Sequence, residues 1–502
     1  MPILSLTLIL ALSGDLYDGV PLTVNRDPSQ VPESRADWLL EAPATEPLTV
    51  RTILPASGSP DVLLLFEDGL TDSLGDGLLE QWIADMTLEG VSTEVLEVSY
   101  AEPTEIRGYL QGRYAEDGIE GALLIGNLPV PWSALDNAYL DEGEQFPSDY
   151  FYMDLDGLWD DLWIGYPSEG RPGTDGMYDT WRDELDPEIY VARIRVDNLQ
   201  ETGDPIDLLD AYLQRNHDWR TLPPSEPPVA LCYVDDDWAA WGTSYRNAML
   251  TLYDDVVLVD DPDSTNGTDY LYQRLPGDWE WISPYVHSSP LIHQWSPGPS
   301  THWFQIVPAE PQARFYNLFA CSNARFTTAS NMGGVYTFST STGLASVGST
   351  KSGSMLGFAQ FYYPMGQGSS IGEAYMSWWD SIAGDGLTPY ELSWHLGMVL
   401  LGDPTLVPAM HMLGIGGGTS PGAAGPELRP SMNPCSGTVS FTVTGDVAGP
   451  LFLYDLGGRL AASAPLSGGG CTLDVSGLEP GVYLARAGSG ARFATAPLVV
   501  SR

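Results

Sequence analysis

The chain has 502 residues, which is long enough for more than one domain and for a large hydrophobic core. Acidic residues outnumber basic ones by 67 to 21, and the formal net charge at pH 7 is −46. Nucleic-acid binding requires clustered Lys and Arg, so this composition, with Lys351 as its single lysine, excludes nucleic acid as a partner.

The N-terminal residues 1–14 contain an apolar run of signal-peptide length, Pro2 to Gly14, which predicts export. The run is too short to cross a bilayer and lacks a basic start. No other stretch has the apolar length of a membrane helix, so no transmembrane span is expected. Residues 15–55 are rich in Pro, Asp and Glu without a clear period and are interpreted as an N-terminal extension. The sequence leaves open whether this extension contains a propeptide.

Residues 56–410 alternate between short apolar runs and segments with helical spacing, which predicts an α/β domain with a mostly parallel sheet flanked by helices. Thr104 is the expected cap of one helix. The predicted strands are 61–66, 91–98, 121–125, 188–196, 228–234, 255–259, 281–286, 315–320 and 343–349. The predicted helices are 74–89, 104–114, 199–219, 239–252, 370–381 and 390–401.

A change of composition separates the C-terminal part of the chain. Residues 411–428 are a Gly/Pro-rich linker, and residues 429–502 show short strands divided by Gly-rich turns, which predicts a small all-β sandwich. The expected strands are 437–443, 451–455, 472–475, 482–487 and 491–500. Cys435 and Cys471 both lie in this part, and the sequence does not decide whether they pair.

The strongest chemical signal is a histidine and a cysteine at the ends of two predicted strands. The strand 281–286 is followed by His287 and Ser288, and the strand 315–320 is followed by Cys321. Because consecutive parallel strands are often neighbours, imidazole and thiol are expected on one edge of the sheet. A Cys–His pair is the minimum for nucleophilic catalysis, and the backbone N–H groups of Ser288 and Cys321 are candidate oxyanion donors. His293 is an alternative base or a supporting residue, and Cys321 alone also fits a buried structural thiol.

Two acidic clusters suggest cation binding. Asp154, Asp156 and Asp160 supply hard oxygen ligands at a spacing that suits Ca²⁺, although the pattern is not an EF-hand loop. A solvated acidic loop explains them equally well. The run 235–237 follows a predicted strand and is expected either to bind a cation or to cap the next helix.

Taken together, the motifs over residues 61–408 resemble the gingipain-type cysteine peptidases, which have a caspase-like fold. The resemblance is carried by YVHSS and FACSN at the two strand ends, by GLASVGSTK, by LLGDPTL, and by the block from IRGYLQGRYAEDG to EIYVARIRV. It implies that Cys321 is the nucleophile and His287 the general base. It also implies an acidic residue, assigned here to Asp149, near the specificity pocket or orienting the histidine. The family histidine is usually followed by Gly, whereas Ser288 follows here and would be strained if the position needs a positive φ.

The segments NPCSGTVSFTV, LFLYDLGGRL and LEPGVYLARA resemble the type IX secretion sorting domain of exported bacterial proteins. That resemblance implies contact with outer-membrane secretion machinery and a secreted or cell-surface location; the alternative is a generic binding sandwich. The predicted function is a secreted cysteine endopeptidase that acts on proteins or peptides, with no cofactor for its chemistry and with structural Ca²⁺ as an option. The alternative is an inactive surface protein that uses the fold for binding or for cation-dependent adhesion.

Overall fold

The computed structural model describes residues 17, 19–27, 29–136, 143–161, 176–182, 185–221, 228–384, 386–409, 427–432, 435–444, 450–455, 460–466, 469–478, 481–489 and 492–500. The predicted signal peptide and most of the predicted linker therefore lie outside the described residues. The chain divides into two compact units. The larger comprises Met1–Glu80, Ser92–Trp219 and Pro228–Pro408, and the smaller comprises Gln81–Val91, Arg220–Pro227 and Ala409–Arg502. Within the described ranges, no helix combines the length and the apolar character needed to cross a membrane.

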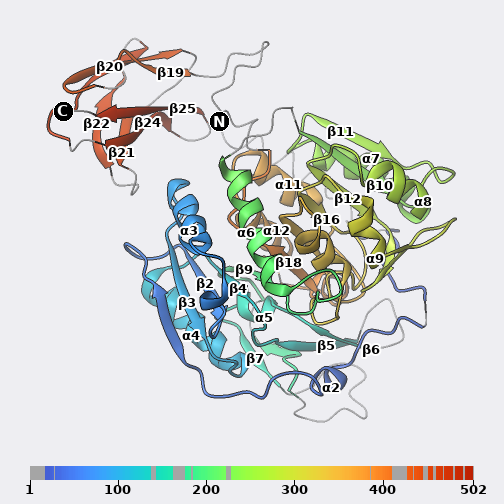
Figure 1. Ribbon diagram of the computed structural model, residues 1–502. Helices are drawn as coiled ribbons and strands as arrows, with labels where there is room; N and C mark the ends of the chain where they lie inside the picture. The colour runs from blue at the N-terminus through green and yellow to red at the C-terminus, as the bar shows by residue number, and fades with distance from the viewer. Residues whose placement is uncertain are drawn as a thin grey trace. The chain divides into compact units, whose positions relative to one another are not determined.

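The larger unit is built on one eleven-stranded, mostly parallel sheet, which confirms the predicted α/β class (Figure 1). Its strands, in spatial order, are β1 (Val50–Leu54), β3 (Thr93–Val98), β2 (Val62–Glu67), β4 (Gly121–Ile125), β9 (Tyr190–Ile194), β18 (Met398–Gly402), β17 (Ala345–Ser349), β16 (Phe315–Asn317), β12 (Trp281–Tyr285), β10 (Val229–Val234) and β11 (Asp255–Val259).

Strand direction in this sheet changes at the edge, where β1 pairs antiparallel with β3, and near the centre. Strands β17 and β18 pair antiparallel, while β18 pairs parallel with β9. As a result β16, β12 and β10 point one way, and β4 and β9 point the other way. The carboxyl ends of β10, β12 and β16 therefore share one edge of the sheet, which is the edge where side chains at the ends of these strands can meet.

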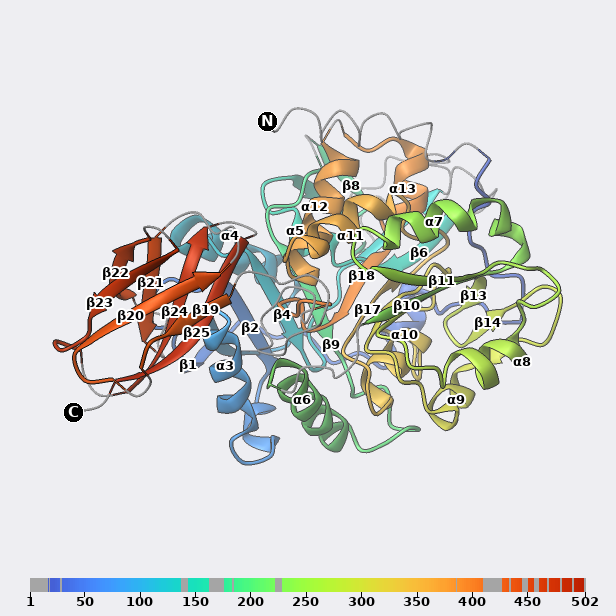
Figure 2. The same cartoon turned by 90° about the horizontal axis from the view of Figure 1, so that it is seen from above.

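Buried strands explain why helices flank the sheet. Strands β4 and β9 are buried at every position, so both faces need a cover. Figure 2 shows α7, α11 and α12 on one side of the sheet and α6 and α9 on the other. The helices of this unit include α2 (Arg35–Trp38), α4 (Pro103–Asp117), α5 (Tyr150–Met153), α6 (Pro205–Thr221), α7 (Gly242–Met249), α9 (Trp303–Ile306), α11 (Phe358–Gly366), α12 (Ile371–Ala383) and α13 (Pro389–His395), and short hairpins are formed by β5 (Trp132–Asp136) with β6 (Gly143–Pro147) and by β7 (Leu158–Asp160) with β8 (Thr180–Arg182).

Several predicted boundaries are wrong, and one error changes the topology. The helix expected over 390–401 ends at His395, and the apolar run that follows is the central strand β18. A short apolar run is compatible with a helix or with a strand. Here the run forms a strand because it pairs with β9 on one side and β17 on the other. The helix expected from 104 starts one residue earlier, with Pro103 at its first position and Glu102 rather than Thr104 as the cap residue. The helix α6 begins at Pro205 instead of 199.

The described part of the C-terminal segment forms two facing antiparallel sheets, which confirms the predicted small sandwich. They contain β19 (Glu427–Pro430), β20 (Thr438–Thr444) and β23 (Gly470–Asp474) in one sheet, and β22 (Leu460–Pro465), β21 (Pro450–Asp455), β24 (Gly481–Ser489) and β25 (Arg492–Val500) in the other. Val439, Leu451 and Leu498 are among the fully buried residues of its core. Cys435 and Cys471 are present as thiols rather than as a disulfide.

Candidate functional site

Three neighbouring parallel strands deliver the candidate catalytic side chains to one edge of the large sheet. Strand β12 lies between β10 and β16. Trp281 pairs with Phe315 and Tyr285 bridges to Phe319, an offset of 34 residues that also separates His287 from Cys321. The predicted adjacency of the two strands is therefore confirmed. The next strand, β10, runs directly into the 3-10 helix η2 (Asp236–Trp241), which carries Asp237.

Cys321 is fully buried, and its thiol points toward the backbone that follows His287. The Sγ–H group donates a hydrogen bond of 2.6 Å to the carbonyl oxygen of Ser288. Burial raises the pKa of the Cys321 thiol well above its usual range, so the thiol is protonated in this arrangement. The chain turns sharply at the next residue, because Ser322 has a φ of 54°. A left-handed conformation costs a non-glycine residue roughly 1–2 kcal/mol, which the surrounding structure must offset.

His287 opens the short strand β13 (His287–Ser289) and has a partner at each ring nitrogen. Its Nε2 lies 2.8 Å from Oδ2 of Asp237, and its Nδ1 lies 3.0 Å from both the N–H nitrogen and the carbonyl oxygen of Val24. Since a carboxylate only accepts, the neutral ring carries its proton on Nε2, and Nδ1 accepts from Val24. Burial lowers the pKa of His287, and the charge of Arg26 lowers it further. These two effects outweigh Asp237, which raises the pKa.

Asp237 is a candidate functional residue that the sequence interpretation did not single out. The acidic run 235–237 was expected to bind a cation or to cap a helix. Asp235 occupies the cap position but makes no capping hydrogen bond, and its carboxylate instead accepts from the backbone N–H of Ser296. The available signal was positional: Asp237 follows a strand that neighbours the histidine strand, at the same sheet edge.

His293, the alternative base or supporting residue, lies beside Ser288. It lies on β14 (Ile292–Gln294), opposite Ser288 in an antiparallel pair, and its Nδ1 is 3.2 Å from the Ser288 hydroxyl. Burial lowers the pKa of His293 to about 3, so its ring stays neutral. Ser288 itself is extended within β13. The non-glycine residues of the described chain with positive φ are Glu310, Ser322, Ser330 and Ala409, so the strain expected at Ser288 is absent and appears at Ser322 instead.

Asp149 forms an ion pair with Arg193, and among the described residues no contact joins it to His287; its expected place near the specificity pocket stays a prediction. Its two carboxylate oxygens accept from Nε and Nη2 of Arg193 at 2.7 and 2.8 Å. Both side chains are almost fully buried, and Arg193 also donates to the carbonyl oxygen of Pro129. Arg193 lies on β9, whose direction is opposite to that of β12, and the bidentate pair fixes Asp149 there.

The predicted calcium ligands are only partly brought together. One carboxylate oxygen each of Asp154, Asp156 and Glu188 lie within 4.8 Å of one another, whereas Asp160 is not part of this group. Burial raises the pKa of Asp154 to about 6 and that of Glu188 to about 7. Glu188 accepts hydrogen bonds from the backbone N–H groups of Leu155 and Asp156. The calcium site stays a prediction, with Glu188 in place of Asp160.

This acidic group predicts a pH effect on stability. Carboxylates whose folded pKa is raised bind protons more tightly in the folded state, so their contribution is complete below the unfolded pKa and is lost as pH rises through about 6 to 7. We expect the Tm to fall between pH 5 and pH 8, and Glu188→Gln to reduce that fall by about 2 °C. The measurement is thermal unfolding of both chains across this range; identical pH profiles would contradict the assignment.

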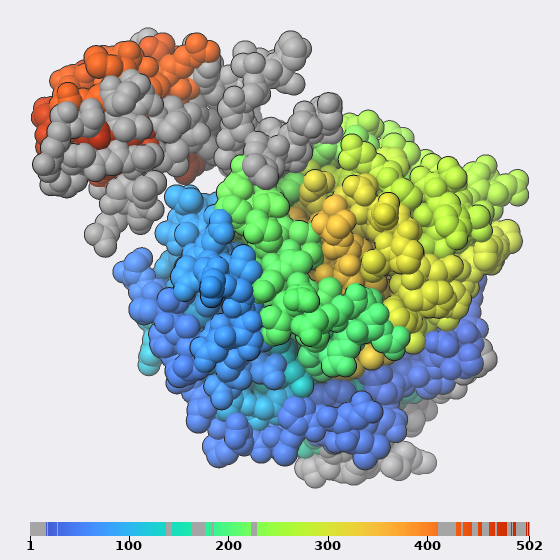
Figure 3. All heavy atoms as spheres, viewed as in Figure 1, coloured from blue at the N-terminus to red at the C-terminus, as the bar shows by residue number. Residues whose placement is uncertain are grey.

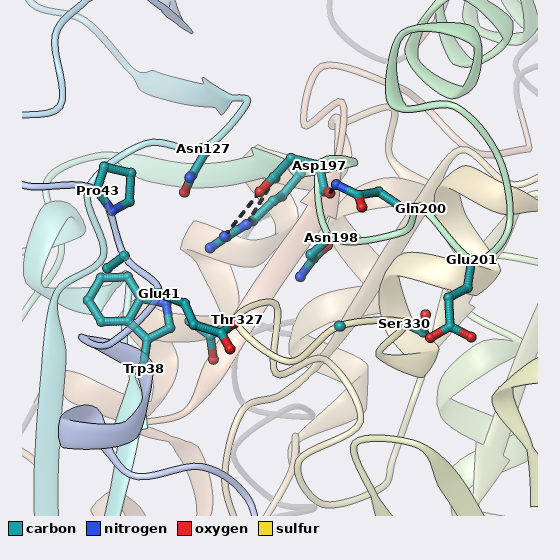
Figure 4. Close-up of a pocket in the computed structure, with 13 residues that line it drawn as sticks. Trp38, Glu41, Pro43, Asn127, Asp197, Asn198, Gln200, Glu201, Thr327 and Ser330 are labelled. Carbon is teal, nitrogen blue, oxygen red and sulfur yellow. Dashed lines mark hydrogen bonds and ion pairs between the residues drawn. The ribbon is translucent and has the colours of Figure 1, made fainter.

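One cavity of the larger unit is lined by residues other than Cys321 and His287. It has a volume of about 440 Å³, and Figure 4 shows Trp38, Asn127 and Asp197 around it. Asp197 is paired there with Arg195, at 3.1 Å between Nε and Oδ1. Neither Cys321 nor His287 is among the described residues that line it. The edge that carries these two side chains is instead covered by the N-terminal chain.

We call the described residues between Tyr17 and Glu33 the N-terminal strap. Figure 2 shows the dark-blue chain passing beside β13 and β14, and in Figure 3 it lies at the surface alongside the yellow and green segments. Val24 contacts His287, and Arg26 forms an ion pair with Asp237. The backbone N–H of Arg26 also donates to the side-chain oxygen of Gln294, at 2.6 Å. The residues that sequence reasoning treated as an irregular extension thus touch two of the three candidate catalytic groups.

Solved structures supply the comparison for this architecture. No protein-family model matches the sequence, and no curated protein matches it. The crystal structure of the Arg-specific cysteine proteinase gingipain R (RgpB) is similar with a TM-score of 0.53 and 13% identity, over 88% of this chain and 98% of that chain. The complex of Porphyromonas gingivalis RgpB pro- and mature domains is similar with a TM-score of 0.55 and 13% identity, over 88% and 100%. The chain therefore has a gingipain-like, caspase-type α/β fold.

Proposed function

We propose that the protein is a cysteine endopeptidase in which Cys321 is the nucleophile, His287 the general base and Asp237 the carboxylate that positions the histidine. The observation that carries this proposal is the arrival of these three side chains from the ends of three adjacent parallel strands. A nucleophile, a base and a group that orients the base are the parts of a catalytic triad, whatever their order in the chain.

The hydrogen bonds assign a role to each ring nitrogen of His287. Asp237 keeps the proton on Nε2, so Nδ1 is the nitrogen available to take the proton from Cys321. The thiolate then attacks the peptide carbonyl carbon to form a tetrahedral species, for which the N–H groups of Ser288 and Cys321 are the proposed oxyanion donors. The protonated imidazole gives its proton to the leaving amine. Water, activated by the same nitrogen, hydrolyses the thioester and restores the thiol.

The test is covalent labelling with a peptidyl electrophile. To expose the site, a recognition sequence for a specific protease is inserted after Glu41, in the turn where Leu40 is 84% exposed. The chain is then cut, and the molecules that have lost the N-terminal fragment are collected by size-exclusion chromatography. We expect the cut chain to be labelled at Cys321 and His287→Ala to lower the labelling rate at least about tenfold at neutral pH. Labelling of the cut chain that is no faster than that of a small free thiol, and unaffected by His287→Ala, would overturn the proposal.

A non-catalytic binding protein is the second candidate, and the burial of Cys321 favours it. A thiol that is fully buried, with its pKa raised, is the usual state of a structural cysteine. The two candidates differ in the labelling experiment, because a structural thiol remains unreactive after the strap is released.

We further propose that the protein is exported and reaches the bacterial cell surface or medium through outer-membrane secretion machinery. The apolar N-terminal segment and the sorting-domain resemblance of residues 429–502 support this proposal. Protein or peptide substrates follow from the proposed endopeptidase chemistry, and the cation-dependent adhesion alternative depends on the group formed by Asp154, Asp156 and Glu188.

A further inference from the structure

The strap competes directly with the chemistry proposed for His287. Val24 places a backbone donor and a backbone acceptor at 3.0 Å from Nδ1, so that nitrogen is satisfied whether the ring is neutral or protonated. Nδ1 is also the nitrogen that must receive the proton of Cys321. While Val24 is in place, the imidazole has no nitrogen left for the thiol.

Arg26 opposes the charged state that catalysis requires. Its guanidinium pairs with Oδ2 of Asp237, the same oxygen that lies 2.8 Å from His287 Nε2. The positive charge of Arg26 offsets the negative charge of the carboxylate that would otherwise stabilise the imidazolium. Burial lowers the pKa of His287, and the charge of Arg26 lowers it further. The strap therefore makes it less favourable for His287 to accept the proton of Cys321 and to keep it.

Backbone hydrogen bonds hold the strap as a binding groove would hold a peptide. The carbonyl oxygen of Thr23 accepts from the N–H of Gly353 at 3.0 Å, and that of Pro21 accepts from the Trp238 indole at 2.8 Å. The side-chain oxygen of Gln294 accepts from the backbone N–H of Arg26 at 2.6 Å; its Nε2 group also donates to the side chain of Asn25, a contact that does depend on the side chain. Contacts to main-chain groups are independent of side-chain identity, so the same donors and acceptors can hold another peptide.

One strap side chain is poorly matched to its surroundings. Thr23 is fully buried, and its hydroxyl is a buried oxygen with no hydrogen-bond partner among the described residues. Burying a hydroxyl without a partner is unfavourable, whereas the methyl group of valine in the same place has no such cost. The position accepts the shape of a small β-branched residue and rejects its polar group.

A second anchor lies away from the catalytic edge. The carboxylate of Glu33 accepts from the hydroxyls of Thr327 and Thr328 at 2.6 and 2.7 Å and lies 3.4 Å from Nε of Arg325. Burial alone would raise the pKa of Glu33, but the charge of Arg325 and the two hydroxyl groups outweigh it and hold the pKa below the usual value. The carboxylate is therefore ionised at neutral pH and stabilises the strap from a distance.

We propose that the strap occupies the peptide-binding groove of this site and keeps the protein latent until the strap is displaced. In a bound peptide, the residue at the buried position of Thr23 would then be a small β-branched aliphatic residue. This inference rests on the proposed function, since latency presupposes an activity. The ligand it assigns to the groove is an extended peptide segment that bonds to the N–H of Gly353 and carries valine or isoleucine where the strap carries Thr23.

Substitutions at Thr23 test the proposal in the cuttable chain described above. Thr23→Val removes the unpartnered hydroxyl and should hold the strap more tightly; Thr23→Asp buries a charge and should expel it. Before cutting, we expect labelling of Cys321 to be at least about tenfold faster in Thr23→Asp than in the parent, and slower than the parent in Thr23→Val. After cutting, size-exclusion chromatography should show that most strap fragment stays bound to the rest of the protein with valine at position 23, less with threonine and least with aspartate. Equal labelling rates in all three uncut chains would overturn latency.

A variant at the second anchor guards against a folding defect at Thr23. Glu33→Gln loosens contacts far from His287 and is expected to speed labelling, whereas Glu41→Gln, the same change on an exposed side chain, is not. Thermal unfolding shows whether each chain is folded. Equal labelling rates for Glu33→Gln and Glu41→Gln would contradict the anchoring role.

Synthetic peptides test the groove in trans. A peptide covering residues 19–30, with Thr, Val or Asp at position 23, is added to the cut Thr23→Asp chain. We expect the Val peptide to protect Cys321 from labelling about tenfold more strongly than the Thr peptide, and the Asp peptide least. Equal protection by the three would overturn the selectivity. If Cys321 is never labelled but the strap fragment is still retained in the expected order, the proposed catalysis fails and strap docking stands. If labelling is rapid in every uncut chain, the proposed reactivity of Cys321 stands and latency fails.

Discussion

Replacement of Cys321 by alanine is expected to abolish cleavage of a denatured protein substrate by the cut chain, lowering the rate by about 10³-fold or more. The thioester cannot form without the sulfur, and removal of a nucleophile that acts as a unit with its base removes nearly the whole effect of that unit. The measurement is the initial rate of cleavage by wild type and variant at equal concentration.

Cys232→Ala is the matched control for this experiment. Cys232 is the other fully buried thiol of the larger unit, on β10, and burial raises its pKa in the same way. We expect this variant to retain cleavage after correction for any loss of folded protein. Equal cleavage by wild type and by Cys321→Ala would assign the activity to a contaminant and end the peptidase proposal.

Asp149→Ala is expected to destabilise the larger unit by about 3–5 kcal/mol. Arg193 is fully buried, and Asp149 is its carboxylate partner, so truncation leaves an uncompensated charge inside the protein. The Phe326 ring, 4.5 Å from the guanidinium carbon, and the carbonyl oxygen of Pro129 offset only part of that cost. Urea unfolding of the full chain, followed by a signal from the larger unit, measures the loss.

Asp117→Ala gives the corresponding control at a more exposed ion pair. Asp117 pairs with Arg113 one turn away on α4, and its side chain is 27% exposed. Such an i,i+4 pair contributes about 0.3–0.5 kcal/mol, so the two variants should differ about tenfold in effect. Similar small losses from both would mean that Arg193 finds other partners, and Asp149 would then have no special structural role.

The α/β class and the adjacency of the two strands that lead to the candidate catalytic residues could be predicted because they depend on local patterns. The runs 62–66 and 121–125 are short and apolar at successive positions, and such runs require burial on both faces of a sheet. Parallel strands that follow one another in the chain are commonly neighbours, which placed His287 and Cys321 on one edge. Errors occurred where a short run fits two structures, as in β18.

The carboxylate partner of the histidine could not be predicted, because a carboxylate's partner depends on which strands are adjacent and on their direction. Asp149 lies in an acidic block and Asp237 in an acidic run after a predicted strand, so the neighbouring residues in the sequence do not tell which of the two meets the histidine. The antiparallel pair β17–β18 reverses the strands around Arg193, so Asp149 meets an arginine there, while Asp237 emerges beside His287.

The sequence by itself determined the α/β class, the C-terminal sandwich and the adjacency of the two strands that lead to His287 and Cys321, since hydrophobic periodicity and strand order are properties of the chain near each residue. The tertiary structure alone decided that Asp237 contacts the histidine and that the N-terminal strap covers it. Val24 and His287 are separated by 263 residues, and no local pattern records a hydrogen bond between groups so far apart in the chain. Such contacts are set by where the folded sheet edge leaves donors and acceptors unsatisfied, and the N-terminal chain is the segment that satisfies them.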